Sequence, residues 1–145
     1  MRFNRTFIYI LGIVWFGLFS SFCSGADKKF NHNFKGWDSN HGRRAIISFN
    51  LLADGLVNGK LDITPLCEKK IKLAGGQLTF SGMVTGAYPQ VSGSFKGLSL
   101  LCGGKKIPLN GTMKLGYHPV YGVFIQLFGN GTSEEYHFKK AKNPF

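Results

Sequence analysis

The chain has 145 residues, with 18 lysines and arginines against 7 acidic residues and a formal net charge of +11 when histidine is neutral. Such a length suffices for one domain but not for two, and the basic excess favours both solubility and attraction to anionic partners. No Gly-x-Ser-x-Gly elbow, phosphate-binding loop or sequence-specific nucleic-acid motif occurs in it. The best-marked enzyme classes are therefore excluded.

The first 26 residues have the features of a secretory signal peptide. Arg2 and Arg5 give a charged start, residues 7–22 form an apolar core, and small residues at 24–26 suit a signal peptidase. The alternative is an uncleaved membrane anchor formed by residues 7–23, but this run is at or below the lower limit of about 17–25 residues for a span. We expect a secreted or periplasmic protein that keeps 119 of its 145 residues, 16 basic and 7 acidic, with a net charge of +9.

Residues 27–42 are polar, contain Asn and Gly, and lack the alternation typical of a strand. We predict an arm that docks loosely on the rest of the chain. Phe30, Phe34 and Trp37 have the spacing of one short amphipathic helical turn, but the residues around them are poor helix formers. Lysines interleave with these aromatics, as in sites for single-stranded nucleic acid or sugars, although large aromatics more often pack onto a core.

Residues 43–145 have the pattern of an all-β domain, because apolar and polar residues alternate along short segments with one buried and one wet face. The apolar positions expected to face a core are Ala45, Ile47, Phe49, Leu51, Leu61, Ile63, Leu78, Phe80, Val84, Val91, Phe95, Met113, Leu115, Tyr117, Tyr136 and Phe138. Residues 120–128 are apolar on both faces, which predicts a central or doubly covered strand.

Turn-forming pairs separate these segments. They are Asp54-Gly55, Asn58-Gly59, Gly75-Gly76, Tyr88-Pro89, Gly103-Gly104, Asn110-Gly111, His118-Pro119 and Asn130-Gly131, of which Asn58-Gly59 also suits a bulge inside a strand. The fold class predicted is an antiparallel meander of about seven or eight strands that forms a small barrel or sandwich. A β-solenoid is the alternative, because the glycines at 59, 76, 93 and 111 recur every 17 or 18 residues.

The chain also repeats itself. Residues 57–90 and 91–119 share one ordered set of Val, Gly, Leu-Cys, Lys-Lys-Ile, Leu, Gly and Pro, whereas a partial copy at 120–140 lacks the cysteine and the Lys-Lys-Ile run. A recurring set of this kind indicates an internal duplication, in which each unit places the same side chains in the same local geometry. Repetition describes architecture and by itself supplies no chemistry.

Cys67 and Cys102 occupy equivalent positions in the two full copies and are the only cysteines after residue 26. An even pair of cysteines in a small exported domain predicts a disulfide, and no Cys-x-x-Cys spacing supports a metal site. Such a bond would close a loop of 35 residues and so contribute strongly to the stability of a small domain.

Each of these cysteines is followed by lysines: Lys69, Lys70 and Lys72 after the first, and Lys105 and Lys106 after the second. A disulfide holds its Cα atoms about 5–6 Å apart, so the bond would gather all five lysines at one place. We predict that this cluster binds the phosphate, sulfate or carboxylate groups of an anionic glycan, a lipid headgroup or another polyanion. The alternative is a solvated edge that discourages aggregation.

Catalysis has little support, and we expect no catalytic residue, cofactor or metal. His32 and His41 with Lys35 could form a metal-independent nuclease site, and His32, Asp38 and His41 a metal site, but their spacing matches no established pattern. We therefore expect an exported, non-enzymatic binding module. The rivals are a structural or assembly protein of the envelope or of a secreted complex, which would pair with a protein partner through an open sheet edge, and a small secreted hydrolase.

Overall fold

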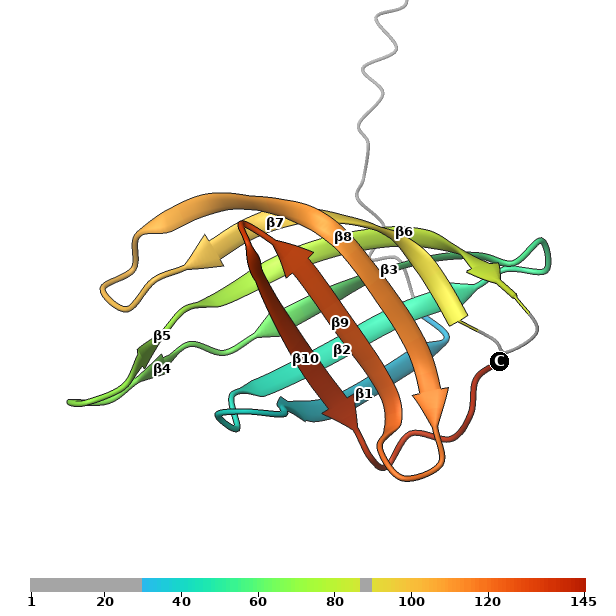
Figure 1. Cartoon of the computed structure of the whole chain (residues 1–145), viewed down its shortest axis with the longest axis horizontal. Coiled ribbons are helices and arrows are strands. Elements are labelled where there is room, and N and C mark those ends of the chain that lie inside the picture. Colours follow the sequence, from blue (N-terminus) through green and yellow to red (C-terminus); the bar gives the residue numbers. More distant parts are fainter. Residues whose placement is uncertain (1–29, 87–89) are drawn as a thin grey trace, which may run out of the picture.

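The computed structural model describes residues 30–86 and 90–145, and the predicted signal peptide lies outside them. The strands are β1 (His32–Asp38), β2 (Arg44–Leu51), β3 (Leu56–Ile63), β4 (Leu66–Cys67), β5 (Lys72–Leu73), β6 (Gly75–Thr85), β7 (Gln90–Leu100), β8 (Lys106–His118), β9 (Gly122–Gly129) and β10 (Thr132–Phe138). Eight of them close into a barrel in the order β1-β10-β9-β8-β7-β6-β3-β2, and β4 and β5 form a separate hairpin (Figure 1).

All neighbouring strands of the barrel are antiparallel. The predicted all-β meander forming a small barrel is therefore confirmed, and the solenoid alternative is wrong. Closure gives each of the eight barrel strands a partner on both sides, but β1 pairs with β10 only at Trp37 and Asp38, and residues 106–111 of β8 pair only with β7. In the described chain, open sheet edges are therefore short and lie there and on β4 and β5.

Inward-facing side chains fill the barrel. Every apolar position predicted from the alternation lies in one buried core or packs against it, with Leu51, Val84 and Tyr117 at its margin. The largest fully buried side chains are Tyr136, Phe49, Phe138, Ile47, Leu61, Met113, Leu115, Ile125, Val57, Val91 and Val123. An eight-stranded barrel has an interior just wide enough for its own side chains, and these residues occupy it.

Two of the predicted turn glycines lie instead inside strands, beneath aromatic rings. Gly59 pairs with Phe80, and Gly111 pairs with Phe95. A Cβ would come within 2.6 Å of the Phe80 ring at Gly59 and within 2.9 Å of the Phe95 ring at Gly111. The turns expected at 58–59 and 110–111 are wrong because glycine there makes room for a ring, and the pair at 75–76 begins β6 rather than a turn. The alternative position of 58–59 inside a strand is right, but β3 pairs there in regular register, without a bulge.

The other described turn signals are confirmed. Residues 54–55, 103–104, 119 and 130–131 connect consecutive strands, and 88–89 lie outside the described residues. Asn130 and Gly131 have φ values of 51° and 74°, which is the left-handed pair that a type I′ hairpin requires.

The barrel is closed by a strand that the sequence pattern concealed. Residues 32–38 form β1, which pairs with β2 on one side and with β10 on the other. The prediction of a loosely docked arm over 27–42, and of a helical turn within it, is wrong for this stretch. Its inner positions are His32, Phe34, Gly36 and Asp38, of which only Phe34 is a large apolar residue, so hydropathy does not alternate.

The two full sequence copies coincide with two consecutive hairpins, β3–β6 and β7–β8, and their leading valines, Val57 and Val91, are both fully buried. The partial copy differs, because Val120 lies in a turn and is 67% exposed. Of the two alternatives predicted for 120–128, the central strand is confirmed, because β9, which begins at Gly122, is paired with β8 and β10; the doubly covered strand is wrong, because Phe128 on its outer face is exposed.

We expect Gly59→Ala to lower the free energy of unfolding by about 1–3 kcal/mol, because its Cβ would overlap the Phe80 ring and the Ser48 carbonyl oxygen in a close-packed interior. Gly76→Ala is the matched control: this glycine is also buried in a barrel strand, but the nearest atom to its Cβ would be the Leu98 carbonyl oxygen at 3.0 Å. Urea denaturation measures both variants. Equal losses of unfolding free energy in the two variants would show that the Phe80 ring does not need the space that Gly59 leaves.

Candidate anion-binding site

Two hairpins project past the same end of the barrel. β7 and β8 stay paired as far as Leu100 and Lys106, whereas the pairing of β8 with β9 begins only at Thr112. The β4–β5 hairpin extends the neighbouring pair β3–β6 beyond a break at residues 64–65. Both hairpins reach the left of Figure 1. We call residues 66–73 and 97–109 the paired tips.

A disulfide ties the paired tips together. The predicted bond between Cys67 and Cys102 is present, with the two Cα atoms 5.6 Å apart. Cys67 ends β4 and Cys102 lies in the turn between β7 and β8, so the bond joins one hairpin to the next across the sheet. The lysines that follow each cysteine are thereby carried on adjacent hairpins.

All five lysines predicted to bind anions lie on the paired tips and are exposed: Lys69, Lys70, Lys72, Lys105 and Lys106. Glu68 is the one acidic residue in residues 66–73 and 97–109, so the paired tips carry a net charge of +4. None of the ion pairs formed between residues of the described chain includes any of these lysines. Their charges are therefore left to solvent or to a ligand.

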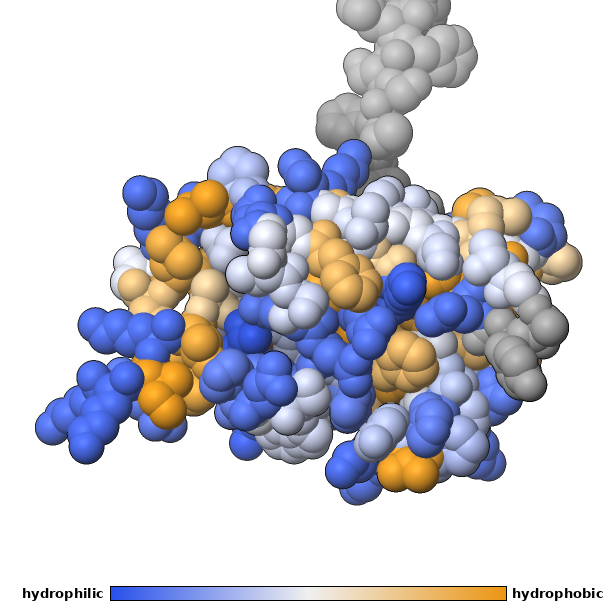
Figure 2. All heavy atoms as spheres, in the orientation of Figure 1, coloured by the Kyte–Doolittle hydropathy of each residue, from blue (hydrophilic) through white to orange (hydrophobic). Residues whose placement is uncertain are grey.

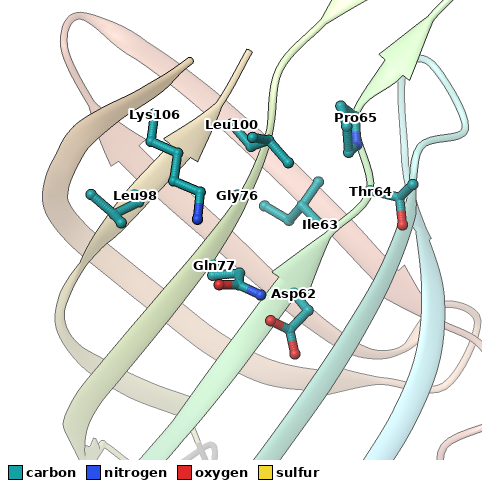
Figure 3. Close-up of a pocket in the computed structure, with 9 residues that line it drawn as sticks. All are labelled: Asp62, Ile63, Thr64, Pro65, Gly76, Gln77, Leu98, Leu100 and Lys106. Carbon is teal, nitrogen blue, oxygen red and sulfur yellow. The ribbon is translucent and has the colours of Figure 1, made fainter. Parts of the chain in front are cut away.

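A groove of about 350 Å³ lies on the wall of the barrel beside the paired tips (Figure 3). Its lining residues are Asp62, Ile63, Thr64, Pro65, Gly76, Gln77, Leu98, Leu100 and Lys106. Asp62, Gln77 and Leu98 lie side by side on three neighbouring strands, and Lys106 pairs with Leu100 nearer the end of the β7–β8 hairpin. An anion would bind at the Lys106 end, because the Asp62 carboxylate repels it from the other.

The barrel interior offers much less space. A cavity of about 120 Å³ lies under the paired tips and is lined in part by Arg43, Phe95, Leu127 and Glu134. Pockets for small ligands usually measure about 300–1,000 Å³, so this cavity is too small and the outer groove is within the range.

A buried network holds the base of the β4–β5 hairpin from inside the barrel. The Arg43 Nε donates to Asp38 at 2.8 Å, and the Arg43 Nη2 lies 3.2 Å from Glu134 Oε1. The Arg43 Nη1 donates to the carbonyl of Ala74, the residue that links β5 to β6. Sequence reasoning missed this network, because it placed Asp38 in a loose arm; only a strand–turn–strand interpretation of 32–51 brings the two residues together.

The charges of this network are fixed at neutral pH. Burial tends to raise the pKa of Asp38, but hydrogen bonds from Arg43 and from the backbone of His41 and Asn40 lower it below the ordinary 3.8. Burial tends to lower the pKa of Arg43, yet its bonds to Asp38 and Glu134 raise it. Burial, and then the bond to Glu134, raise the pKa of the Tyr136 hydroxyl. None of these three groups is tuned to exchange protons near pH 7, so the network is structural.

Of the residues considered for nuclease or metal chemistry, the structure brings together only Asp38 and His41, with His41 Nδ1 3.5 Å from Asp38 Oδ2. His32 begins β1 at one end of the barrel and stacks on Phe49 at 4.9 Å, while His41 lies in the turn that follows the other end of β1. Asp38 bonds to Arg43, and no cluster of three or more potential metal ligands occurs in residues 30–86 and 90–145. The His32–His41–Lys35 and His32–Asp38–His41 sites are therefore not formed.

The aromatic residues of β1 do not form a stacking surface either. Phe34 faces inward and packs against the core, whereas Trp37 is 52% exposed on the outside with Arg44 over its ring. Phe30 precedes β1, and the Lys60 ammonium lies 5.9 Å from the centre of its ring. Bases could not stack on these rings as one continuous row.

The chain matches no known protein-family model, no curated protein and no solved structure. In the part of the chain that the structure describes, no helix is long and apolar enough to cross a membrane.

We expect the free energy of unfolding to fall below about pH 4. Asp38 and Glu135 have pKa values lowered in the folded state, so the unfolded chain binds protons first. The stability that Asp38 contributes is present above its unfolded pKa and is lost as the pH falls through its lower folded pKa. Urea midpoints at about pH 7 and pH 3 measure the loss.

Asp38→Asn should reduce this pH dependence and cost about 3 kcal/mol at neutral pH, because it leaves the buried Arg43 guanidinium without the nearer of its two carboxylates. Glu135→Gln is the control, since this carboxylate is only half-buried and the cost should be smaller. A pH dependence unchanged by Asp38→Asn would contradict the assignment.

Removal of the disulfide by the double change Cys67→Ser and Cys102→Ser should lower the free energy of unfolding by about 4 kcal/mol, because the bond closes a loop of 35 residues. Denaturation of the variant, beside the parent with and without reductant, measures the loss. Mass spectrometry that finds two free thiols in the native protein would contradict the bond itself.

Proposed function

We propose that the protein is an exported, non-enzymatic binding module whose paired tips hold an anionic partner. One observation carries this proposal: five exposed lysines sit on two hairpins that a disulfide joins at a Cα separation of 5.6 Å. The signal-like N-terminal sequence supports export, and so does the disulfide, because such bonds persist in oxidising compartments.

The lysine cluster favours an anionic ligand because its members repel one another. Charges within a Debye length of about 8 Å interact at physiological ionic strength, and the net charge of the paired tips is +4. A partner with several phosphate, sulfate or carboxylate groups relieves this repulsion. Lysine ammonium groups on flexible stems suit a ligand surface of many anions better than one anion of fixed geometry.

The partner classes that fit are an anionic glycan, a lipid headgroup or another polyanion. In the described strands, the rival assembly role would have only short open edges to use, such as residues 106–111 of β8, which pair with β7 alone, and the part of β1 that precedes its two-residue pairing with β10. The rival hydrolase lacks the converging histidines it was built on, because His32 and His41 lie at opposite ends of β1. The paired tips thus support binding better than they support either rival.

Replacement of Lys69, Lys70, Lys105 and Lys106 by Gln should weaken retention on heparin by about 1 kcal/mol for each lysine, as for lysines beside other anionic surfaces. The salt concentration at elution measures this. Replacing Lys35, Lys96, Lys140 and Lys142 by Gln is the control, because these lysines are also exposed but lie outside the paired tips, and the charge change is the same. Equal weakening in both variants would mean that net charge, and not the cluster, holds the polyanion.

A further inference from the structure

The paired tips are apolar as well as basic. Ile71, Leu98 and Ile107 are 43%, 42% and 40% exposed. Four leucines of the same hairpins are partly exposed: Leu66, Leu73, Leu100 and Leu101. In Figure 2 hydrophobic residues gather at the left end of the molecule, where the tips lie, with hydrophilic ones beside them. Exposed apolar groups concentrated in one place mark a contact surface.

The apolar side chains occupy both faces of the β7–β8 hairpin. Leu98 pairs with Pro108, and the next pair, Ser99 with Ile107, points to the opposite face because side chains alternate along a strand. A flat protein partner would cover one face of this hairpin and leave the other wet. A lipid interface surrounds an inserted tip and would bury both faces.

The lysines complete an arrangement typical of interfacial insertion. Lysine stems lie along apolar surface while their ammonium groups reach the phosphates, so charge and apolar burial act together. Lys105 and Lys106 directly precede Ile107, and Lys70 and Lys72 flank Ile71. Each exposed isoleucine therefore has lysines next to it in the chain, and their flexible stems can reach the phosphates around an inserted tip.

We infer that the paired tips dock onto an anionic lipid bilayer, with Ile71, Leu98 and Ile107 entering the headgroup region and the five lysines binding lipid phosphates. This inference rests on the proposed function and names its partner. The groove beside Leu98 extends the contact along the wall, because Pro65, Leu98 and Leu100 give it an apolar side and Lys106 a cationic end. The disulfide lets both hairpins enter together, which matters because one short tip exposes little apolar surface.

The test is co-sedimentation of the oxidised protein, purified after export, with vesicles of mixed phosphatidylcholine and phosphatidylglycerol, and with vesicles of phosphatidylcholine alone. We expect binding to the anionic vesicles only. The triple change Ile71→Ser, Leu98→Ser and Ile107→Ser should weaken that binding about tenfold or more and leave retention on heparin unchanged. The four-lysine variant should lose both.

The matched control is the triple change Leu52→Ser, Met83→Ser and Val120→Ser. These residues are as exposed as the first set, or more so, and lie at the opposite end of the barrel. The control should bind anionic vesicles like the parent, and an equal loss there would overturn the docking surface. Heparin retention without vesicle binding would overturn the lipid inference and leave the proposed function standing, whereas failure of both would overturn both.

Discussion

The width of the barrel is the constraint on which the rest of the structure depends. Eight strands enclose space for one set of side chains, and two phenylalanine rings fit inside only because glycines face them at 59 and 111. The interior therefore has little room for a ligand: the cavity at one end is about 120 Å³, while the groove on the wall is about 350 Å³. Because the core is filled, a ligand would have to bind on the outer surface of the barrel or on the hairpins that project from one end.

Those hairpins are held at their base and near their ends. Arg43 bonds to the carbonyl of Ala74 from inside the barrel, and the disulfide joins Cys67 to Cys102. Because Arg43 is itself fixed by two carboxylates, the base of the β4–β5 hairpin is tied to β1 and β10 across the barrel. The lysines thus project from a braced support, while their flexible stems can still adjust to a ligand.

The regular part of the fold follows from local patterns, and its exceptions come from contacts distant in sequence. Alternation predicts the inner positions of β2, β6 and β8 because each has one wet and one buried face. It fails for β1, where Asp38 faces inward and is neutralised by Arg43 across a turn. The Asn-Gly turn signals also misplace two turns, because a glycine beneath a ring has the same local signature as a glycine in a hairpin. The equivalent positions of Cys67 and Cys102 predicted that the two segments would be joined. No local sequence pattern indicated that these hairpins extend beyond the end of the barrel.

The disulfide between the hairpins also determines when the paired tips begin to act as one surface. Two basic hairpins that move independently engage a charged sheet of lipid as two weak ligands, whereas joined hairpins engage it as one bivalent ligand with a high effective concentration for the second contact. Sulfur oxidation takes place outside the reducing cytosol. Under the proposed export and lipid docking, the newly made chain would therefore keep the reduced, weakly binding form in the cytosol and acquire avidity only after export.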